Sequence, residues 1–309
     1  MASRIIDPRI RLRHITSFLE VARLRSVGRA AEALNVSQPA VSKTILELEQ
    51  LLGVGLFDRS GRTIALTDSG ELFLRYAGTS LSALREGIAS IRDSQADVVV
   101  RVGALPTVSA RVLPPAVRKF TARKAQALPR IVTGPNGYLL SLLRQGSVDF
   151  VVGRMAAPDE MTGLSFEHLY SERIALIVRP GHPLLAAASF TLSMLEGYQI
   201  LMPPHGSVIR PLVEQFFLAH GTEPPRDQVE TVSNAFGNAY VRMTDAVWLI
   251  SEGVVANEID SDRLAVLPFD TAETLGPVGL TRRNETTYSL AAEMLMDDIR
   301  DVAAGFARG

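Results

Sequence analysis

Three runs of apolar residues at helical spacing lie within residues 12–52, with turns of only a few residues between them. The first two runs, 12–24 and 27–34, flank Ser26, a residue type that commonly caps a helix N-terminus. Asn35 follows the second run, and asparagine tolerates the left-handed backbone that a tight turn between helices requires. The pattern therefore predicts short helices that must pack against one another.

The third run predicts a helix over 38–51 that begins at a capping residue, Ser37, with Pro39 in its first turn. Its buried stripe is expected to contain Val41, Ile45, Leu48 and Leu52. The leading positions that this stripe leaves exposed are Gln38, Pro39, Ser42 and Lys43, and together with Ser37 they are our candidate DNA-binding residues on this helix. Glutamine can read adenine edges, serine can contact bases or phosphates, and lysine can reach guanine or phosphate. The segment is thus typical of a helix-turn-helix whose second helix enters the major groove.

Residues 53–67 predict two short strands joined by a turn at Ser60–Gly61, which together form a wing. Arg59 and Arg62 lie on this wing, and Arg29 lies on the preceding helix. Arginines in these places suit contacts with phosphates or with the minor groove. A small helical domain that packs against another protein would show similar helical periodicity. The exposed polar face, the wing and the helix that follows favour DNA.

Thr67 is placed to cap a long helix over roughly residues 68–95. Leu81, Leu84, Ile88 and Ile91 recur in it at steps of three, four and three residues. That is the seam spacing of a helix pair, so we expect this helix to mediate dimerisation.

From Val98 onward the pattern changes to short apolar strands that alternate with helices. The expected strands are 98–105, 130–133, 148–153, 174–178, 199–202, 229–232, 247–250, 264–267 and 278–281. The expected helices lie near 109–122, 137–145, 208–220, 236–243, 251–259 and 287–304. Such alternation favours α/β layers with largely parallel sheets. The segment is large for one sheet, so we expect two subdomains with a cleft between them.

Charge is unevenly distributed along the chain. Residues 1–66 carry ten Lys and Arg against six Asp and Glu, whereas the whole chain carries 32 against 33. A basic N-terminal region followed by an acidic remainder suggests that only the N-terminal region binds a polyanion. No cysteine is present, which excludes disulfides and thiolate metal sites. With no long apolar run and no secretory signal at the N-terminus, we expect a cytoplasmic protein without a cofactor or a membrane partner.

Residues 12–77 resemble the DNA-binding domain of the LysR-type transcriptional regulators. The matching stretch is FLEVARLRSVGRAAEALNVSQPAVSKTILELEQLLGVGLFDRSGRTIALTDSGELFLRYA. The resemblance extends over the whole chain in length, linker helix and C-terminal α/β region. It implies a regulator, commonly a homotetramer built from two dimer types, that activates or represses by changing DNA bending when a small effector binds. The implied partners are double-stranded promoter DNA, the effector and RNA polymerase.

The same resemblance implies a fold of three parts. They are a winged helix-turn-helix over 1–67, a linker helix over 68–96, and an effector-binding domain over 97–309 that resembles periplasmic solute-binding proteins. Within that domain, subdomain one would comprise 98–171 plus 275–305, and subdomain two would comprise 172–274.

Four loops are candidates for the effector site, because each follows a strand and precedes a helix, where unpaired N–H groups are offered. They are 106–109, 133–136, 203–207 and 233–236, and by resemblance the first two and the last two line opposite walls of the cleft. Our candidate effector-binding residues are Thr107, Val108, Thr133, Gly134, His205, Ser207, Ser233 and Asn234. Hydroxyl groups beside helix N-termini suit a carboxylate, to which His205 and Arg210 would add charge. The alternative for each hydroxyl is a simple helix cap.

Two further stretches, TDAVWLISEGVVANEI (244–259) and GPVGLTRR (276–283), resemble regulators of protocatechuate catabolism. This resemblance implies an aromatic-acid catabolite, such as a muconate-type polycarboxylate, as effector. A neighbouring branch of the family responds to sugars, and these residues do not separate the two branches.

An enzyme is disfavoured because its usual motifs are missing from the sequence. There is no G-x-S-x-G elbow, no phosphate-binding G-x-x-x-x-G-K-[ST] loop and no G-x-G-x-x-G. His205 and Ser207 are neighbours in sequence, which rarely gives the geometry of a catalytic triad. The five histidines show no metal-ligand spacing. A transport solute-binding protein would explain the α/β region, but it would need an export signal.

Overall fold

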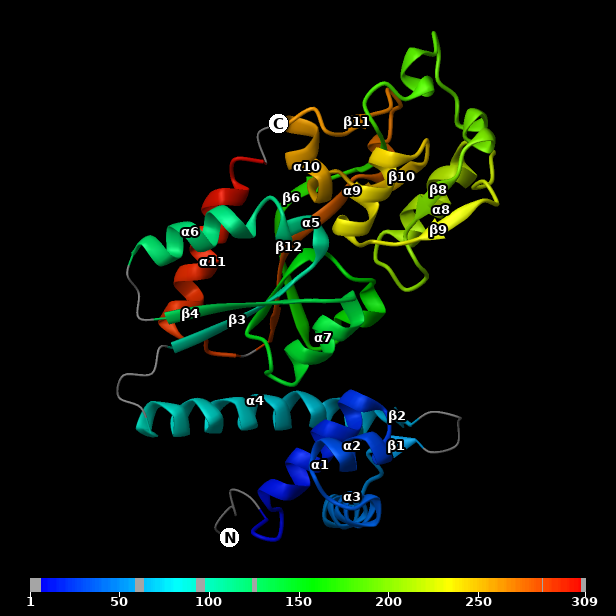
Figure 1. Ribbon diagram of the computed structural model, residues 1–309. Coiled ribbons are helices and arrows are strands. Elements are labelled where there is room, and N and C mark those ends of the chain that lie inside the picture. The colour runs from blue at the N-terminus through cyan, green and yellow to red at the C-terminus, as the bar shows by residue number, and fades with distance from the viewer. Residues whose placement is uncertain (1–6, 59–63, 93–97, 124–126, 285, 307–309) are drawn as a thin grey trace. The chain divides into compact units, whose positions relative to one another are not determined.

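The computed structural model describes residues 7–58, 64–92, 98–123, 127–284 and 286–306 (Figure 1). They form two compact units. The first contains the described residues of 1–96 together with 141–147, and the second contains those of 97–140 and 148–309. No helix in the described part is long and apolar enough to cross a membrane.

The first unit is a helix-turn-helix followed by a two-stranded wing and a long helix. Its elements are α1 (Leu12–Leu24), α2 (Val27–Ala33), α3 (Gln38–Leu52), β1 (Phe57–Asp58), β2 (Ala65–Leu66) and α4 (Asp68–Arg92). The core is built around Phe18 and Leu48, both fully buried, and the small Ala30 lets α2 approach its neighbours closely. The wing strands pair antiparallel, with Phe57 opposite Leu66. The predicted Ser60–Gly61 turn lies outside the described residues.

Local capping explains where these helices begin. The Ser26 hydroxyl accepts the backbone N–H of Arg29 at 3.3 Å, and Asn35 has the expected positive φ of 54°. Ser37 occupies the N-cap of α3, but its side chain makes no capping hydrogen bond, contrary to our prediction. Pro39 lies at the second helical position and has no N–H to donate. The N–H of Ala40 is bonded to the carbonyl of Ser37 instead, at 3.0 Å.

The long helix α4 begins as predicted. The Thr67 hydroxyl accepts the N–H of Gly70 at 3.0 Å and donates to the Gly55 carbonyl at 2.7 Å, which ties the helix start to the wing. On the predicted seam, Leu84 and Ile88 are 45% and 42% exposed. Apolar side chains left open at seam spacing are typical of a face that a second helix covers.

The second unit contains two five-stranded sheets. The first sheet has the order β4-β3-β5-β12-β6, and the second has the order β11-β7-β10-β8-β9. The first is made of β3 (Val98–Ala104), β4 (Ala127–Thr133), β5 (Phe150–Arg154), β6 (Leu164–Glu172) and β12 (Gly276–Arg283). The second is made of β7 (Ile174–Val178), β8 (Ile200–Met202), β9 (Gln228–Glu230), β10 (Val247–Ser251) and β11 (Ala265–Val266).

The expectation of largely parallel sheets is only half right. Each sheet contains two parallel and two antiparallel pairings. In the first sheet, β12 returns from the end of the chain and inserts antiparallel between β5 and β6. The sequence pattern does not predict strand β6, because its alternating polar residues, LSFEHLYSE, do not form an apolar run.

Helices flank these sheets. They are α5 (Pro106–Ser109), α6 (Leu113–Ala122), α7 (Asn136–Arg144), α8 (Arg210–Ala219), α9 (Asn234–Met243), α10 (Glu252–Asp260) and α11 (Leu290–Ala303). The predicted helix over 109–122 is in fact two, α5 and α6. Pro114 and Pro115 lack N–H groups and are tolerated only in a first turn, so a new helix starts just before them. Helices α6 and α11 pack side by side next to the first sheet (Figure 1).

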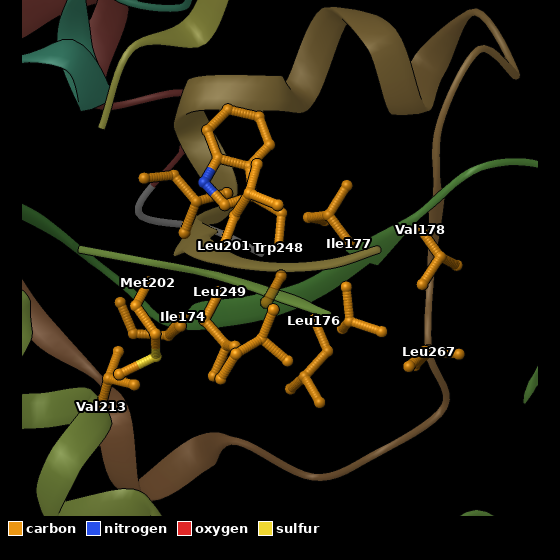
Figure 2. Close-up of a cluster of buried hydrophobic side chains, with 14 of the residues drawn as sticks. Ile174, Leu176, Ile177, Val178, Leu201, Met202, Val213, Trp248, Leu249 and Leu267 are labelled. Carbon is orange, nitrogen blue, oxygen red and sulfur yellow. The ribbon is translucent and has the colours of Figure 1, made fainter. Parts of the chain in front are cut away.

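The second sheet has two faces, and both are buried. Trp248 pairs with Ile177 and Leu249 with Leu176 across β10 and β7, so successive side chains point to opposite faces. Figure 2 shows Trp248 and Ile177 on one side of the strands and Leu249 and Leu176 on the other. Strands buried on both faces are near-continuous apolar runs, which is why the sequence pattern located β7 and β10 well.

Candidate DNA interface and effector site

The leading end of α3 is open to a partner. Ser37, Gln38, Pro39 and Lys43 are all exposed, as the buried stripe of the helix predicted. Ser42 differs, because it is only half-exposed and lines a small cavity of about 130 Å³ beneath the helix with Ile45 and Phe57. The structure therefore brings Gln38 and Lys43 to the surface more fully than Ser42.

The predicted arginines divide into one described and two undescribed residues. Arg29 is exposed on α2, and one of its guanidinium nitrogens, Nη2, donates to the Leu24 carbonyl at 2.6 Å. This bond holds the side chain against the end of α1. Arg59 and Arg62 of the wing lie outside the described residues.

A glutamate that sequence reasoning missed joins α3 to the wing. The Glu49 carboxylate accepts the backbone N–H groups of Leu56 at 2.8 Å and Phe57 at 3.2 Å. Charge-assisted bonds of this kind hold strand β1 in a fixed place relative to the helix. The signal in the sequence was weak, since a glutamate near the end of an amphipathic helix is usually a solvated residue.

In the second unit, the first candidate loop holds one polar and one apolar buried residue. The Thr107 hydroxyl is buried and donates a hydrogen bond to the Glu172 carboxylate. Thr107 is therefore not a helix cap, and the N-cap of α5 is Leu105. Val108 is fully buried in the core beside the first sheet, which leaves its side chain no free surface.

The partner of Thr107, Glu172, belongs to a buried ion pair that the sequence did not predict. Arg154 at the end of β5 and Glu172 at the end of β6 are both buried, with Nε and Oε1 3.7 Å apart. Arg154 also donates from Nε to the Ser251 hydroxyl at 3.0 Å and from Nη2 to the Glu172 carbonyl at 2.7 Å. Its Nη1 and the Oε2 of Glu172 have no hydrogen-bond partner among the described residues. Burial raises the pKa of the Glu172 carboxyl, and the nearby guanidinium opposes that rise.

Two glycines leave room for this pair. A Cβ on Gly276 would lie 2.4 Å from Nη1 of Arg154, and a Cβ on Gly253 would lie 2.5 Å from Oε2 of Glu172. The cluster thus joins residues of the first sheet with Ser251 and Gly253, which belong to the end of β10 and the start of α10. It links the two sheets at the place where the chain passes from β6 to β7.

The other candidate effector residues have mixed surroundings. Thr133 is exposed and Gly134 half-exposed at the end of β4. His205 is exposed and Ser207 half-exposed, and Ser207 caps no helix because α8 starts only at Arg210. Arg210 itself is engaged by Glu214 at 2.6 Å and Glu230 at 2.9 Å.

The fourth loop contains a helix cap and an unpaired amide. The Ser233 hydroxyl accepts the N–H of Phe236 at 3.3 Å, so it acts as the cap of α9. The side-chain oxygen of Asn234 is buried and has no partner among the described residues. In this loop, the Oδ1 of Asn234 is the polar atom that could accept a hydrogen bond from a ligand or a water molecule.

Comparisons with known proteins agree with this arrangement. Residues 12–71 match the bacterial regulatory helix-turn-helix protein, lysR family, and residues 94–304 match the LysR substrate binding domain. The HTH-type transcriptional regulator PcaQ of Agrobacterium fabrum is 52% identical over 301 residues, which is 97% of each chain. A full-length OxyR variant from Pseudomonas aeruginosa has a TM-score of 0.61 at 25% identity, covering 94% of this chain and 97% of its own. ArgP from Mycobacterium tuberculosis has a TM-score of 0.64 at 18% identity, with the same two coverages, 94% and 97%.

Proposed function

This chain belongs to the LysR family of bacterial transcriptional regulators, and on that premise we propose that it reads promoter DNA through the leading end of α3 and senses a small carboxylate. The relatives are named as transcriptional regulators, so the chain is a DNA-binding regulator with an effector-binding domain and not an enzyme. One observation carries the first half of the proposal. The polar residues at the start of α3 are exposed while its apolar stripe is buried.

The choice of a carboxylate is supported by Arg154. Its guanidinium is buried between the two sheets, and its Nη1 has no partner among the described residues. Glu172 balances the charge of Arg154, so the guanidinium offers a ligand its unused Nη1 donor, and a carboxylate oxygen accepts such a charge-assisted hydrogen bond more strongly than a hydroxyl group does. Identity of 52% with PcaQ, together with the resemblance of 244–259 and 276–283, supports an aromatic-acid catabolite of the muconate type. The second candidate is a sugar, since the exposed Thr133 and the half-exposed Ser207 offer hydroxyls that suit polyol ligands.

A thermal-shift screen of the full chain tests the effector class. Muconates, aromatic acids, other dicarboxylates and sugars would each be added at increasing concentration. A ligand at 100 times its Kd adds about 2.7 kcal/mol to the free energy of unfolding, which raises the melting temperature visibly. We expect a shift with a muconate-type acid that Arg154→Met abolishes and that Arg118→Ala, at an exposed arginine of α6, leaves intact. A shift with sugars alone would replace the carboxylate by the second candidate.

Replacing Gln38 with alanine tests the reading face. We expect binding to the cognate promoter site to weaken by about 1–3 kcal/mol, because a bidentate contact with a base edge is lost, while binding to random DNA stays nearly unchanged. Titration of both DNAs at one salt concentration measures the difference. Arg29→Ala is the contrasting variant, since loss of a phosphate contact should weaken both DNAs alike. Equal losses for Gln38→Ala on both DNAs would refute its role as a base reader.

The remaining parts of the proposal concern assembly and location. We propose a homodimer or homotetramer that uses the exposed Leu84 and Ile88 of α4, contacts RNA polymerase at the promoter, and works in the cytoplasm. We also propose the division into 1–67, 68–96 and 97–309, with subdomain one over 98–171 plus 275–305 and subdomain two over 172–274. The family match and the exposed seam of α4 support these points.

A further inference from the structure

A surface pocket of about 360 Å³ lies in the first unit beside the proposed reading helix. It is lined by Arg9, Arg11, Arg13 and His14, which lead into and begin α1, and by Glu47 and Gln50 of α3. None of these residues belongs to the reading face described above. Three arginines around one hollow make an anion the natural occupant.

The charges of this pocket are only partly balanced. Arg9 forms an ion pair with Asp7 at 2.7 Å, and Arg13 lies 3.4 Å from Glu47. Lys43 approaches the same carboxylate at 4.0 Å. Among the described residues, Arg11 forms no ion pair. The described lining of the pocket therefore contains three arginines and one carboxylate, that of Glu47, so its charge is positive.

His14 holds this arrangement in place. It is buried, and its Nδ1 accepts the backbone N–H of Arg11 at 3.1 Å. A backbone N–H can only donate, so the ring hydrogen is on Nε2, which lies 3.4 Å from the Glu47 carboxylate. That hydrogen bond, aided by Arg13 and Lys43, lowers the pKa of Glu47 and keeps it ionised. Through these two hydrogen bonds, His14 connects the backbone at Arg11 to Glu47 of α3.

The pocket continues the face of α3 that carries Lys43. Lys43, Glu47 and Gln50 follow one another at steps of four and three residues and lie on one side of the helix. At 1.5 Å per residue, the pocket end of this face is about 10 Å along the axis from Lys43. The major groove is about 12 Å wide and is bordered by phosphates on both sides. A helix that lies across the groove with its leading end inside it would bring the far end of this face to the phosphate border.

We propose that the arginine pocket binds a phosphate of the DNA backbone beside the site that α3 reads. This inference rests on the proposed reading face. The ligand is a DNA phosphodiester, recognised by charge and without sequence preference, so the pocket adds affinity and fixes the orientation of α3.

The double variant Arg9→Ala/Arg11→Ala tests the pocket by the salt dependence of DNA binding. Both side chains are exposed ahead of α1, so folding is not at risk. We expect the slope of log K against log salt to become shallower by about 1 to 2, and affinity for cognate and random DNA to fall by the same factor. Arg23→Ala is the matched control, because this arginine is at the other end of α1 and is paired with Glu20 at 2.7 Å.

The outcomes separate the pocket from the proposed function. An unchanged slope in the double variant, with normal binding by the parent chain, would overturn the phosphate site and leave the reading face intact. A loss confined to the cognate site would also overturn it. If the parent chain shows no salt-dependent binding to any DNA, the proposed function fails first.

Discussion

Replacing Arg154 with methionine is expected to lower the free energy of unfolding by about 3–5 kcal/mol, because Glu172 then stays buried without a compensating cation. Methionine keeps much of the apolar stem of arginine, so lost packing contributes little. Thr107 and Ser251 remain, but they are neutral and cannot replace the charge. Urea unfolding of the full chain at neutral pH, followed by the fluorescence of the fully buried Trp248, measures the loss.

The double variant Arg154→Met/Glu172→Gln is the control for this experiment. With both charges gone, the remaining cost is one of packing and hydrogen bonding, so we expect most of the lost stability to return. The difference between the double variant and the sum of the single ones gives the coupling between the two side chains. A loss below about 1 kcal/mol for Arg154→Met would show that the pair is not the source of this stability.

The same pair gives the direction of a pH effect. Burial raises the pKa of Glu172 in the folded chain above the ordinary carboxyl value of 4.5. The folded state then holds its proton more tightly than the unfolded state, so stability falls as pH rises from the ordinary value through the raised one. Removing Arg154 removes the cation that opposes this rise, so the pKa of Glu172 rises further and stability falls over a wider range of pH. The Arg154→Met variant should therefore regain part of its loss as the pH is lowered through the raised pKa of Glu172.

The first unit was predictable from sequence because its signals are local. The spacing of α1, the Ser26 cap, the left-handed Asn35 and the Thr67 cap each depend on residues within a few positions of one another. Such patterns can be recognised in a sequence because the interactions that cause them join residues that are close together along the chain. Ser37 shows the limit of this reasoning, since it occupies the N-cap position but its hydroxyl makes no capping hydrogen bond, and the N–H of Ala40 bonds to the Ser37 carbonyl instead.

The centre of the effector-binding region was not predictable in this way. Arg154 and Glu172 belong to β5 and β6, which are not neighbours in the sheet, because β12 from the end of the chain lies between them. No pattern along the chain indicates that these two charges meet. Each alone is typical of a solvated residue at a strand end, and only the antiparallel return of β12 buries them together. Thr107 was identified as a polar candidate, but its partner was not.

Replacing Phe18 with alanine is expected to weaken DNA binding strongly while leaving the second unit folded. Phe18 is fully buried in the first unit, with its ring centre 4.9 Å from that of Phe73 and 5.3 Å from that of Phe57. Removing a buried phenylalanine costs about 3–5 kcal/mol. A unit as small as this one has about that much stability in total, so the variant should populate the unfolded form of the reading domain.

Binding assays and thermal unfolding together measure this effect. Affinity for DNA falls in proportion to the folded fraction of the first unit, so we expect at least roughly a tenfold loss near 25 °C and a further loss on warming. Trp248 lies in the second unit, and its fluorescence transition should stay where it is in the parent chain. Leu46→Ala is the matched control, because Leu46 is 45% exposed on α3 and contributes little to the core. Parent-like DNA affinity in Phe18→Ala would mean that the core around α1 does not hold the reading helix in place.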